Sequence, residues 1–229
     1  MSDSPQHASP GSLKGEVSLS EPTRHERTVA RRSAEIRATV PHAEFTRVVS
    51  MDAACGAASA GGFDPIGLVL AAVARALVEV PALNGAYRDG HAERYSRVNL
   101  GAVIAADGVY AVPTMFDCDE KSAGHLASEY ADLRERALSD RLIPAELTGA
   151  TFTVTDLGPD GIHASGPLVI GGQAGAVSMG ATRVVPILDG DTVRAGRESV
   201  LTLSVDHRVI QAPAAGRFLT AVARGLESA

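Results

Sequence analysis

The segment from Asp64 to Val80 constrains the fold more than any other part of this 229-residue chain. Its apolar side chains point in nearly every direction around a helix, so a helix here must be buried on almost all sides. Asp64 is a good N-cap residue and Pro65 suits the first helical position. Other layers must therefore pack around this helix, and the chain is long enough for one such core.

The remaining segments predict what those layers are. Further helices are expected over residues 24–40, from Ser122 onward with an apolar stripe, and from Pro213 onward, and residues 53–62 are expected to form a loop or a short frayed helix. Strands are expected over residues 45–51, 97–105, 109–116, 151–156, 167–171, 174–188 and 198–207. Asp107-Gly108 lies between two of these runs and predicts a hairpin, and Asp189-Gly190-Asp191 separates two others. This order predicts an α+β sandwich in which helices flank a mixed β-sheet.

Composition argues against nucleic-acid binding, a metal site, a membrane span and secretion. The net charge is −6 and aromatic residues make up 4%, so neither a basic surface nor a stacking platform for nucleic acid is expected. Two distant cysteines predict no metal site and a reduced, cytoplasmic protein. No apolar run is long enough to span a membrane, and residues 1–23, rich in Ser, Pro and Gly, are expected to be a disordered arm rather than a secretion signal.

Sequence motifs exclude several enzyme classes. The chain has no phosphate-binding P-loop, dinucleotide fingerprint, nucleophile elbow or zinc-protease motif. Among seven histidines, His207 stands out because it ends a strongly alternating strand directly before a helix. Such a position suits a general base on a rigid support. Taken alone, it also fits a histidine that is hydrogen-bonded for structural reasons.

Longer motifs decide between these interpretations. The run LTLSVDHRVIQAPAAGRFL (201–219) resembles L-S-x-D-H-R-x-x-D-G followed by a helix with A-x-x-F-L, the C-terminal signature of the 2-oxoacid dehydrogenase acyltransferases. RLIPAELTGATFTVTDLG (141–158) is similar to that family's K-L-x-P-x-E-x-x-G-x-T-F-T-I-S-N-L-G. VARRSAEIRATVPH (29–42), VPALNGAY (80–87) and GGQAGAVSMGATRVVPILDG (171–190) also resemble family stretches, in family order. The resemblance covers residue 24 to the end.

The resemblance implies a fold and a mechanism. The fold would be that of chloramphenicol acetyltransferase, assembled as trimers or multiples of trimers. His207 would be the general base, and the hydroxyl of Thr155 would stabilise the oxyanion of the tetrahedral intermediate. Acetyl-CoA would be the co-substrate, and the acyl group would pass directly to the acceptor. The site would lie between subunits, so that His207 faces Thr155 of the adjacent chain.

Two departures from the family pattern affect the function. Gln211-Ala212 stands where the family has Asp-Gly, so the side chain at 211 keeps hydrogen-bonding capacity but loses its charge. A catalytically silent scaffold is therefore an alternative to an enzyme. Asp206 and Arg208, which flank the base, are expected to be structural and to hold the strand-to-helix turn through charge-assisted hydrogen bonds.

The second departure concerns the acceptor. Residues 24–229 are expected to form one catalytic domain, and the residues before it are too few for a lipoyl domain, so no covalently attached lipoyl group is expected. The predicted acceptor is therefore a free small molecule. Free-standing relatives in tetronate and spirotetronate pathways suggest a primary alcohol on a tetronate ring. The alternative is a dihydrolipoyl group carried by another protein.

Overall fold

The computed structural model describes residues 15, 17–106 and 109–229. The chain divides into two compact units, residues 1–35 and 36–229, and each is described by itself. Most of α1 (Arg24–Thr39) belongs to the first unit. A capping box fixes its start, because the Thr23 N–H donates to the Glu26 carboxylate at 2.6 Å and the Thr23 hydroxyl accepts the Glu26 N–H. The arm expected over residues 1–23 falls mainly outside the described residues.

The second unit contains the remaining elements of the described chain. Its α-helices are α2 (Asp52–Gly61), α3 (Ile66–Glu79), α4 (Ala123–Leu138) and α5 (Ala212–Glu227), with short 3₁₀ turns at η1 (Cys118–Glu120) and η2 (Pro144–Leu147). Its strands are β1 (His42–Ser50), β2 (Gly85–Arg88), β3 (His91–Arg94), β4 (Leu100–Ala106), β5 (Val109–Ala111), β6 (Thr114–Met115), β7 (Phe152–Asp156), β8 (Gly175–Met179), β9 (Arg183–Asp189) and β10 (Thr192–Asp206).

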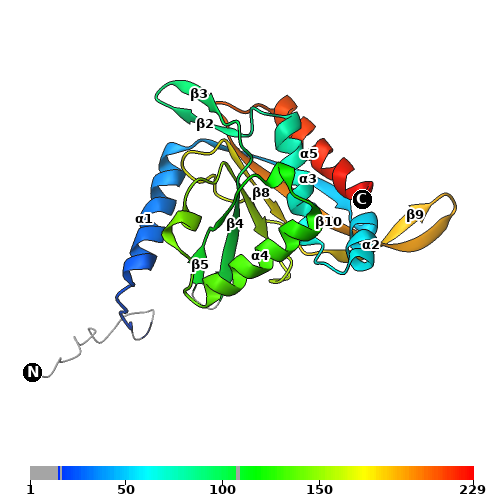
Figure 1. The fold of residues 1–229 in the computed structure, drawn as a ribbon, viewed down its shortest axis with the longest axis horizontal. Helices are drawn as coiled ribbons and strands as arrows, with labels where there is room; N and C mark the ends of the chain where they lie inside the picture. Colours follow the sequence, from blue (N-terminus) through cyan, green and yellow to red (C-terminus); the bar gives the residue numbers. More distant parts are fainter. Residues whose placement is uncertain (1–14, 16, 107–108) are drawn as a thin grey trace, which may run out of the picture. The chain divides into compact units, whose positions relative to one another are not determined.

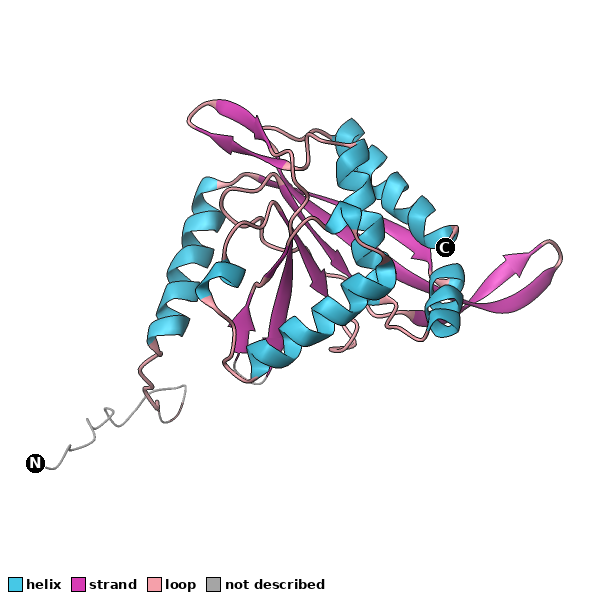
Figure 2. Ribbon diagram, viewed as in Figure 1, coloured by secondary structure: helices cyan, strands magenta, loops and turns pink. Residues whose placement is uncertain are grey.

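All of these strands except β2 and β3 form a mixed sheet (Figure 2), as the sequence predicted. Its order among the described residues is β1-β10-β8-β7-β4-β5, with β6 on β4 and β9 on β10. The pairs β4–β7 and β7–β8 are parallel, and β1–β10 and β10–β8 are antiparallel. Strands β2 and β3 form a separate hairpin. Ala106 pairs with Val109, so the predicted hairpin is present, although Asp107-Gly108 lie outside the described residues.

Helix α3, which the sequence predicts to be buried on almost all sides, is central to the core. The Asp64 carboxylate accepts the Ile66 N–H at 2.9 Å, so it caps α3 as predicted. Of the α3 residues, Val69, Leu70, Val73, Ala74 and Leu77 are fully buried. The Ser122 hydroxyl likewise accepts the His125 N–H at the start of α4. Both helix starts are thus set by local side chains.

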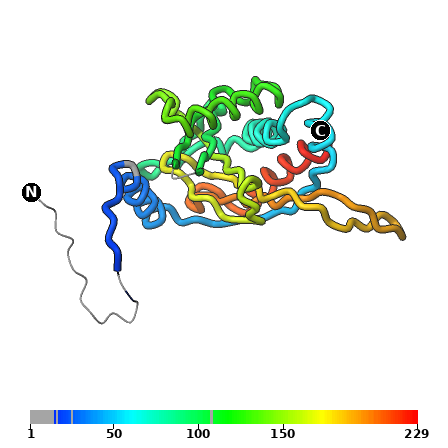
Figure 3. Tube along the Cα trace, turned by 90° about the horizontal axis from the view of Figure 1, so that it is seen from below, coloured from blue at the N-terminus to red at the C-terminus, as the bar shows by residue number. Residues whose placement is uncertain are grey.

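Helices α3, α4 and α5 lie on one side of the sheet (Figure 3). The strand side chains that face them are apolar and buried: Val49, Phe152, Val154, Val177, Leu201, Leu203 and Val205. Phe152 of β7 contacts Phe218 of α5 with ring centroids 5.4 Å apart. Burial of aromatic and branched side chains on this face is the main apolar contribution to the stability of the fold.

The opposite face of the sheet is crossed by residues 157–173, where a strand had been predicted over 167–171. This prediction was wrong. The segment is a loop in which the Val169 N–H donates to His42 Nε2 at 3.0 Å, and the Ser165 carbonyl accepts the Ser178 hydroxyl. A side chain thus takes the place of a strand partner, and Pro167 has no N–H to contribute to a ladder.

The structure also differs in detail from the predictions for residues 174–188 and 53–62. Residues 174–188 form two strands, β8 and β9, which follow one another along β10 with registers that differ by one residue, as a β-bulge over 180–182 produces. Over 53–62, where a loop or a short frayed helix was predicted, the structure has a short helix, α2, closed by Gly62 at φ 69°. The hairpin β2–β3 was not predicted, although Asp89 (φ 49°) and Gly90 (φ 84°) form a turn typical of the Asp-Gly signal.

Candidate active site

His207 lies where the longest strand of the sheet runs into the final helix. Strand β10 ends at Asp206, and the His207 N–H donates to the Pro41 carbonyl at 2.9 Å. The Asp206 carbonyl then accepts the N–H groups of Val209 and Ile210, which closes a tight turn before α5. The histidine is therefore attached to a rigid backbone, as the alternating pattern had predicted.

The imidazole of His207 is held in one tautomer. Its Nδ1 lies 2.9 Å from the carbonyl oxygen of Ile210. Since a carbonyl oxygen can only accept, Nδ1 carries the proton in the neutral ring and Nε2 keeps its lone pair. The side chain is exposed in a single chain, so Nε2 is open to a reactant. This is the arrangement that a general base requires.

Asp206 and Arg208 form an ion pair on either side of the histidine. The Arg208 Nη2 lies 2.6 Å from one carboxylate oxygen of Asp206, and its Nε lies 2.9 and 3.2 Å from the two oxygens. Asp206 is 2% exposed, so its charge is compensated by this pair. The same hydrogen bonds raise the pKa of Arg208 above its usual value. The turn thus contains the charge-assisted contacts that the sequence predicted.

Tyr87 is a contact of this turn that the sequence analysis missed. Its ring, on β2, lies 4.3 Å from the guanidinium carbon of Arg208. This distance is typical of a cation–π interaction, and it brings the β2–β3 hairpin against the strand-to-helix turn. The sequence cue was slight, since Tyr87 is the last residue of the stretch VPALNGAY and is given no role there.

Gln211 supports the backbone of the base. Its Nε2 donates to the His207 carbonyl oxygen at 2.9 Å, from the residue that precedes α5. The contact needs a donor at this position, which an amide provides and a carboxylate would not. Gln211, whose difference from the family's Asp raised the possibility of a silent scaffold, therefore has a structural role in holding the backbone of His207.

Thr155 lies on β7, apart from the other four predicted residues. It pairs with Ser178 of β8 and Val103 of β4 and is partly buried. Thr153, two residues earlier on the same face, is fully buried and donates its hydroxyl to Gln173 at 2.7 Å. The hydroxyl of Thr155 is thus presented from an interior strand of the sheet.

One chain does not bring Thr155 and His207 together. The register places Thr155 level with Ser178 and Thr202, two strands away from β10. His207 lies further along β10 by about 16 Å, and two strand spacings add about 10 Å across, so the Cα atoms are about 19 Å apart. A hydroxyl and a base that act on one carbonyl must both lie near it, so these two residues of one chain do not share a site.

Other kinds of site find no support in the part of the chain that the structure describes. No group of three or more His, Cys, Asp or Glu side chains there could hold a metal ion. No single described helix is long and apolar enough to cross a membrane. Only α2 and α3 together, bent by 117°, meet that test by length and composition, and α3 is the core helix of this fold.

Comparison with known proteins identifies the family. The sequence profile described as "2-oxoacid dehydrogenases acyltransferase (catalytic domain)" matches residues 20–229. The chain belongs to this family. It is 32% identical, over 69% of its length, to the dihydrolipoyllysine-residue acetyltransferase component of the pyruvate dehydrogenase complex from Corynebacterium glutamicum. It covers only 24% of that relative, and half or less of others such as the component from Rickettsia bellii.

Solved structures of the acyltransferase family share the fold. Dihydrolipoamide acetyltransferase from Azotobacter vinelandii is 27% identical with a TM-score of 0.86, covering 97% of this chain and 96% of that one. The cubic core of the pyruvate dehydrogenase multienzyme complex gives the same identity, coverage and TM-score. Chloramphenicol acetyltransferase, at 16% identity over 86% of this chain and 94% of that one, shares the fold alone, with a TM-score of 0.54. The predicted fold class is confirmed.

The Azotobacter structure also bears on individual positions. It was solved to examine the role of a serine, a histidine and an asparagine in the catalytic mechanism of that enzyme. The serine precedes its histidine by as many residues as Thr155 precedes His207, and the asparagine follows by as many as Gln211 does. An amide at the position of Gln211 therefore has a counterpart in this acyltransferase.

Proposed function

We propose that this chain is a CoA-dependent acyltransferase in which His207 Nε2 is the general base. The observation that carries the proposal is the contact between His207 Nδ1 and the Ile210 carbonyl, because in the neutral ring it puts the proton on Nδ1 and leaves the lone pair of Nε2 on an exposed side chain. The family of the chain and the rigid turn on which the histidine stands support the same role.

The reaction follows from these groups. Nε2 takes the proton from the thiol or hydroxyl of the acceptor, whose sulfur or oxygen attacks the thioester carbonyl of the acyl-CoA. The Thr155 hydroxyl donates to the resulting oxyanion. When the intermediate collapses, the bond from the carbonyl carbon to the CoA sulfur breaks, and the imidazolium returns the proton to the leaving thiolate. The products are the acylated acceptor and free CoA, with no acyl-enzyme.

We further propose that each site is shared between two copies of the chain, in a trimer or a multiple of trimers. The separation of about 19 Å supports this, because neither residue can serve the other within one chain. The relationship to the cubic core of the pyruvate dehydrogenase complex supports an assembly built from many copies. His207 of one copy and Thr155 of the next would then complete one site.

The preferred acceptor is a dihydrolipoyl thiol carried by another protein. The relatives that match over most of the domain are dihydrolipoyllysine-residue acetyltransferases and dihydrolipoamide acetyltransferase. The small-molecule acceptor that the sequence predicted, a primary alcohol such as that of a hydroxymethyl tetronate, remains a prediction. A thiol is also the easier acceptor for an imidazole base, since its pKa lies far closer to neutrality than that of an alcohol.

The test is a side-by-side assay with acetyl-CoA, dihydrolipoamide and a hydroxymethyl tetronate, using the wild type and His207→Ala. Acetylation of the thiol that is lost in the variant supports the proposal. Acetylation of the alcohol alone moves the acceptor to the small-molecule class. Turnover that persists in His207→Ala excludes this histidine as the base, and failure of calorimetry to detect acetyl-CoA binding would favour the silent scaffold.

A complementation experiment tests the shared site. His207→Ala and Thr155→Val are each expected to be inactive as pure assemblies. If the two are unfolded together and refolded at equal amounts, about a quarter of the interfaces pair an intact histidine with an intact threonine and regain activity. A mixture that stays as inactive as its components contradicts the shared site. Thr155→Ser, which keeps a hydroxyl, is the control.

A further inference from the structure

The loop over residues 157–173, which joins β7 to β8 (Figure 1, yellow), crosses the face of the sheet opposite the helices. Hydrogen bonds hold it near both of its ends. The Ile162 carbonyl accepts the Ala181 N–H at 2.8 Å, and the Gly172 carbonyl accepts the Tyr95 hydroxyl at 3.0 Å. Between these points side chains of the sheet hold the loop, and one of them is His42.

His42, the first residue of β1, accepts a hydrogen bond from this loop. Its Nε2 lies 3.0 Å from the Val169 nitrogen, and its Nδ1 lies 2.8 Å from the Val40 carbonyl oxygen. A backbone N–H can only donate and a carbonyl oxygen can only accept, so Nε2 offers its lone pair and Nδ1 carries the proton. The Val169 side chain is fully buried, so the hydrogen bond is part of a packed contact between the loop and the sheet.

The loop accepts the hydroxyl hydrogens on either side of Thr155. Thr153, two residues earlier on the same face, donates to Gln173 Oε1 at 2.7 Å. Ser178, the register partner of Thr155 on β8, donates to the Ser165 carbonyl. A hydroxyl has one hydrogen, so neither neighbour can donate to Thr155 or to a reactant while the loop is in place. This arrangement favours Thr155 as the donor to the oxyanion.

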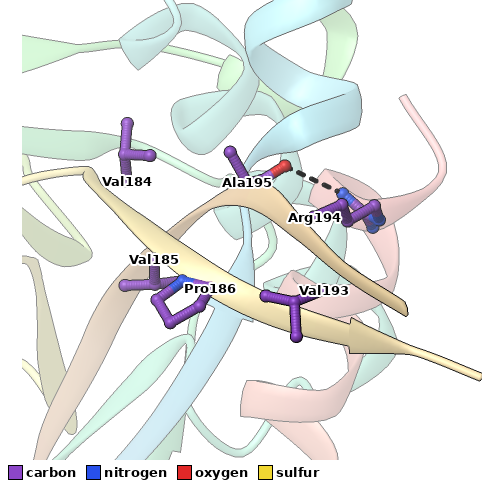
Figure 4. A pocket seen from close by; sticks show the side chains of 6 residues that line it. All are labelled: Val184, Val185, Pro186, Val193, Arg194 and Ala195. Carbon is purple, nitrogen blue, oxygen red and sulfur yellow. Dashed lines mark hydrogen bonds between the residues drawn. The ribbon is translucent and has the colours of Figure 1, made fainter. Parts of the chain in front are cut away.

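The loop also covers hydroxyls of β10 on the same face, since Thr202 and Ser204 are buried there. Beyond Ala181, which the loop still contacts, the ribbon of β9 and the start of β10 is open to solvent. Val184 of this ribbon is 72% exposed, and a shallow hollow of about 280 Å³ lies beside it (Figure 4). Detachment of the loop would therefore admit water to the sheet around Thr155, where it would compete for the hydroxyl.

His42 also lies beside the turn that carries the base. It follows Pro41, whose carbonyl accepts the His207 N–H, and it pairs with Asp206 in the β1–β10 register. His42 thus has two routes to the reaction, one through His207 and one through Thr155. The contacts favour Thr155, because the ring accepts its hydrogen bond from the loop, whereas Pro41 holds the turn through its backbone.

We propose that His42 is a positioning residue for Thr155. Through Val169 it holds the loop over 157–173 against the sheet, and the loop sets the hydroxyls around the oxyanion donor. The inference rests on the proposed function, in which Thr155 donates to the oxyanion, and it adds a residue that acts through others. It concerns contacts within one chain.

Two substitutions separate the two hydrogen bonds of the His42 ring. Asparagine keeps a donor for the Val40 carbonyl but is too short to reach Val169, whereas Oε1 of glutamine can take the place of Nε2. His42→Asn should lower kcat about five- to tenfold with KM for acetyl-CoA within about twofold, and His42→Gln should retain most of the activity. His163→Asn is the matched control, at an exposed position of the loop itself, and should leave kcat unchanged.

Hydrogen exchange and the pH profile identify the route. Amide exchange in the peptide that contains Val169, measured by mass spectrometry, should be at least about tenfold faster in His42→Asn than in the wild type. His42→Gln should exchange nearly as slowly as the wild type. The pH at which kcat falls on the acid side should not move, because the contact of the base with the Ile210 carbonyl is unchanged.

The outcomes decide between this role and others. Unchanged exchange in His42→Asn overturns the inference, and so does faster exchange with unchanged kcat. A shifted acid limb assigns the effect to His207, and faster exchange throughout the chain assigns it to unfolding; both overturn the inference, as does an equal loss in His163→Asn. If the wild type transfers no acetyl group, the proposed function fails and the positioning role with it, while exchange still shows whether His42 holds the loop.

Discussion

Asp206 and Arg208 form an ion pair across His207, the residue that separates them in the chain. The carboxylate is almost completely buried at the end of β10, and the guanidinium reaches it with two of its nitrogens. Because neighbouring residues of an extended strand point to opposite faces, this pair fixes the backbone on both sides of the histidine. The direction of the imidazole is thus set by two residues that need not touch a substrate.

Arg208→Ala tests how much this pair contributes. It leaves the Asp206 carboxylate buried without a cation, and we expect the free energy of unfolding to fall by about 2 kcal/mol at neutral pH. Urea unfolding measures this. The matched control is Arg141→Ala, which removes an exposed pair with Glu135 and should change the value by less than about 0.5 kcal/mol. Equal effects of the two substitutions would contradict the importance of the buried carboxylate.

Tyr87 should position Arg208 through its ring rather than its hydroxyl. Tyr87→Phe keeps the ring face, so kcat should stay within about twofold of the wild type. Tyr87→Ala removes the cation–π contact, and kcat should fall about five- to tenfold while KM for acetyl-CoA changes little. Steady-state kinetics separates the two parameters. A phenylalanine variant as impaired as the alanine variant would show that the hydroxyl, not the ring, is what matters.

Gln211 should act through its amide donor to the His207 carbonyl. We expect Gln211→Ala to lower kcat by about tenfold, because the backbone that carries the base loses a hydrogen bond. Gln211→Asn, the residue type of the Azotobacter relative, should retain more activity than alanine. The comparison uses kcat with saturating acetyl-CoA. If alanine and asparagine variants both match the wild type, the contact at 2.9 Å has no catalytic consequence.

Asp156 makes stability depend on pH in a defined direction. Burial raises the pKa of its carboxyl and outweighs the hydrogen bond from the Gly158 N–H, which lowers it; Asp64 and Asp160 add smaller increases, and Arg134 opposes them. A raised native-state pKa means that the charged form opposes folding, and this cost disappears as the pH falls below the unfolded-state pKa of about 4. Asp156→Asn, which matches the family's N-L-G, should therefore be more stable than the wild type at pH 7.

The difference should close as the pH falls below about 4, where both side chains become neutral in both states. Urea midpoints at the two pH values provide the measurement. Asn can still accept the Gly158 N–H that the Asp156 carboxylate accepts at 2.9 Å, so this local contact survives. Asp119→Asn, at an exposed position, should show no comparable difference. A variant that is less stable at pH 7 would show that burial does not dominate at this carboxyl.

Local signals predicted the parts of the fold that local chemistry determines. Asp64 and Ser122 cap their helices as expected, and the alternation in β10 located both the strand and His207 at its end. The loop over 157–173 could not be predicted in this way, because its contact with His42 joins residues 127 positions apart. The Asp89-Gly90 turn carried a recognisable signal, but its flanking strands are short and largely exposed, so they lack an apolar pattern.

The candidate site also combines residues that local motifs indicate with a contact that only the packing of distant segments creates. Motifs singled out His207, Thr155 and Gln211 as candidates, and the serine, histidine and asparagine studied in the Azotobacter relative have the same spacing. They did not predict the contact between Tyr87 and Arg208, because it depends on how the β2–β3 hairpin packs against a distant turn. The cytoplasmic location and the disorder of residues 1–23 remain predictions of the sequence.

Strand β10 carries the two-stranded ribbon that it forms with β9 at one end and His207 just beyond the other, over 15 residues or about 50 Å. A single strand thus fixes the distance between this ribbon and His207, the residue proposed to react. Inserting or deleting one residue in it would move the side chains on one side of the change to the opposite face of the sheet, unless a β-bulge absorbed the change. The spacing along this strand can therefore change by one residue only where a bulge forms, as in the one-residue shift between the β8 and β9 registers on β10.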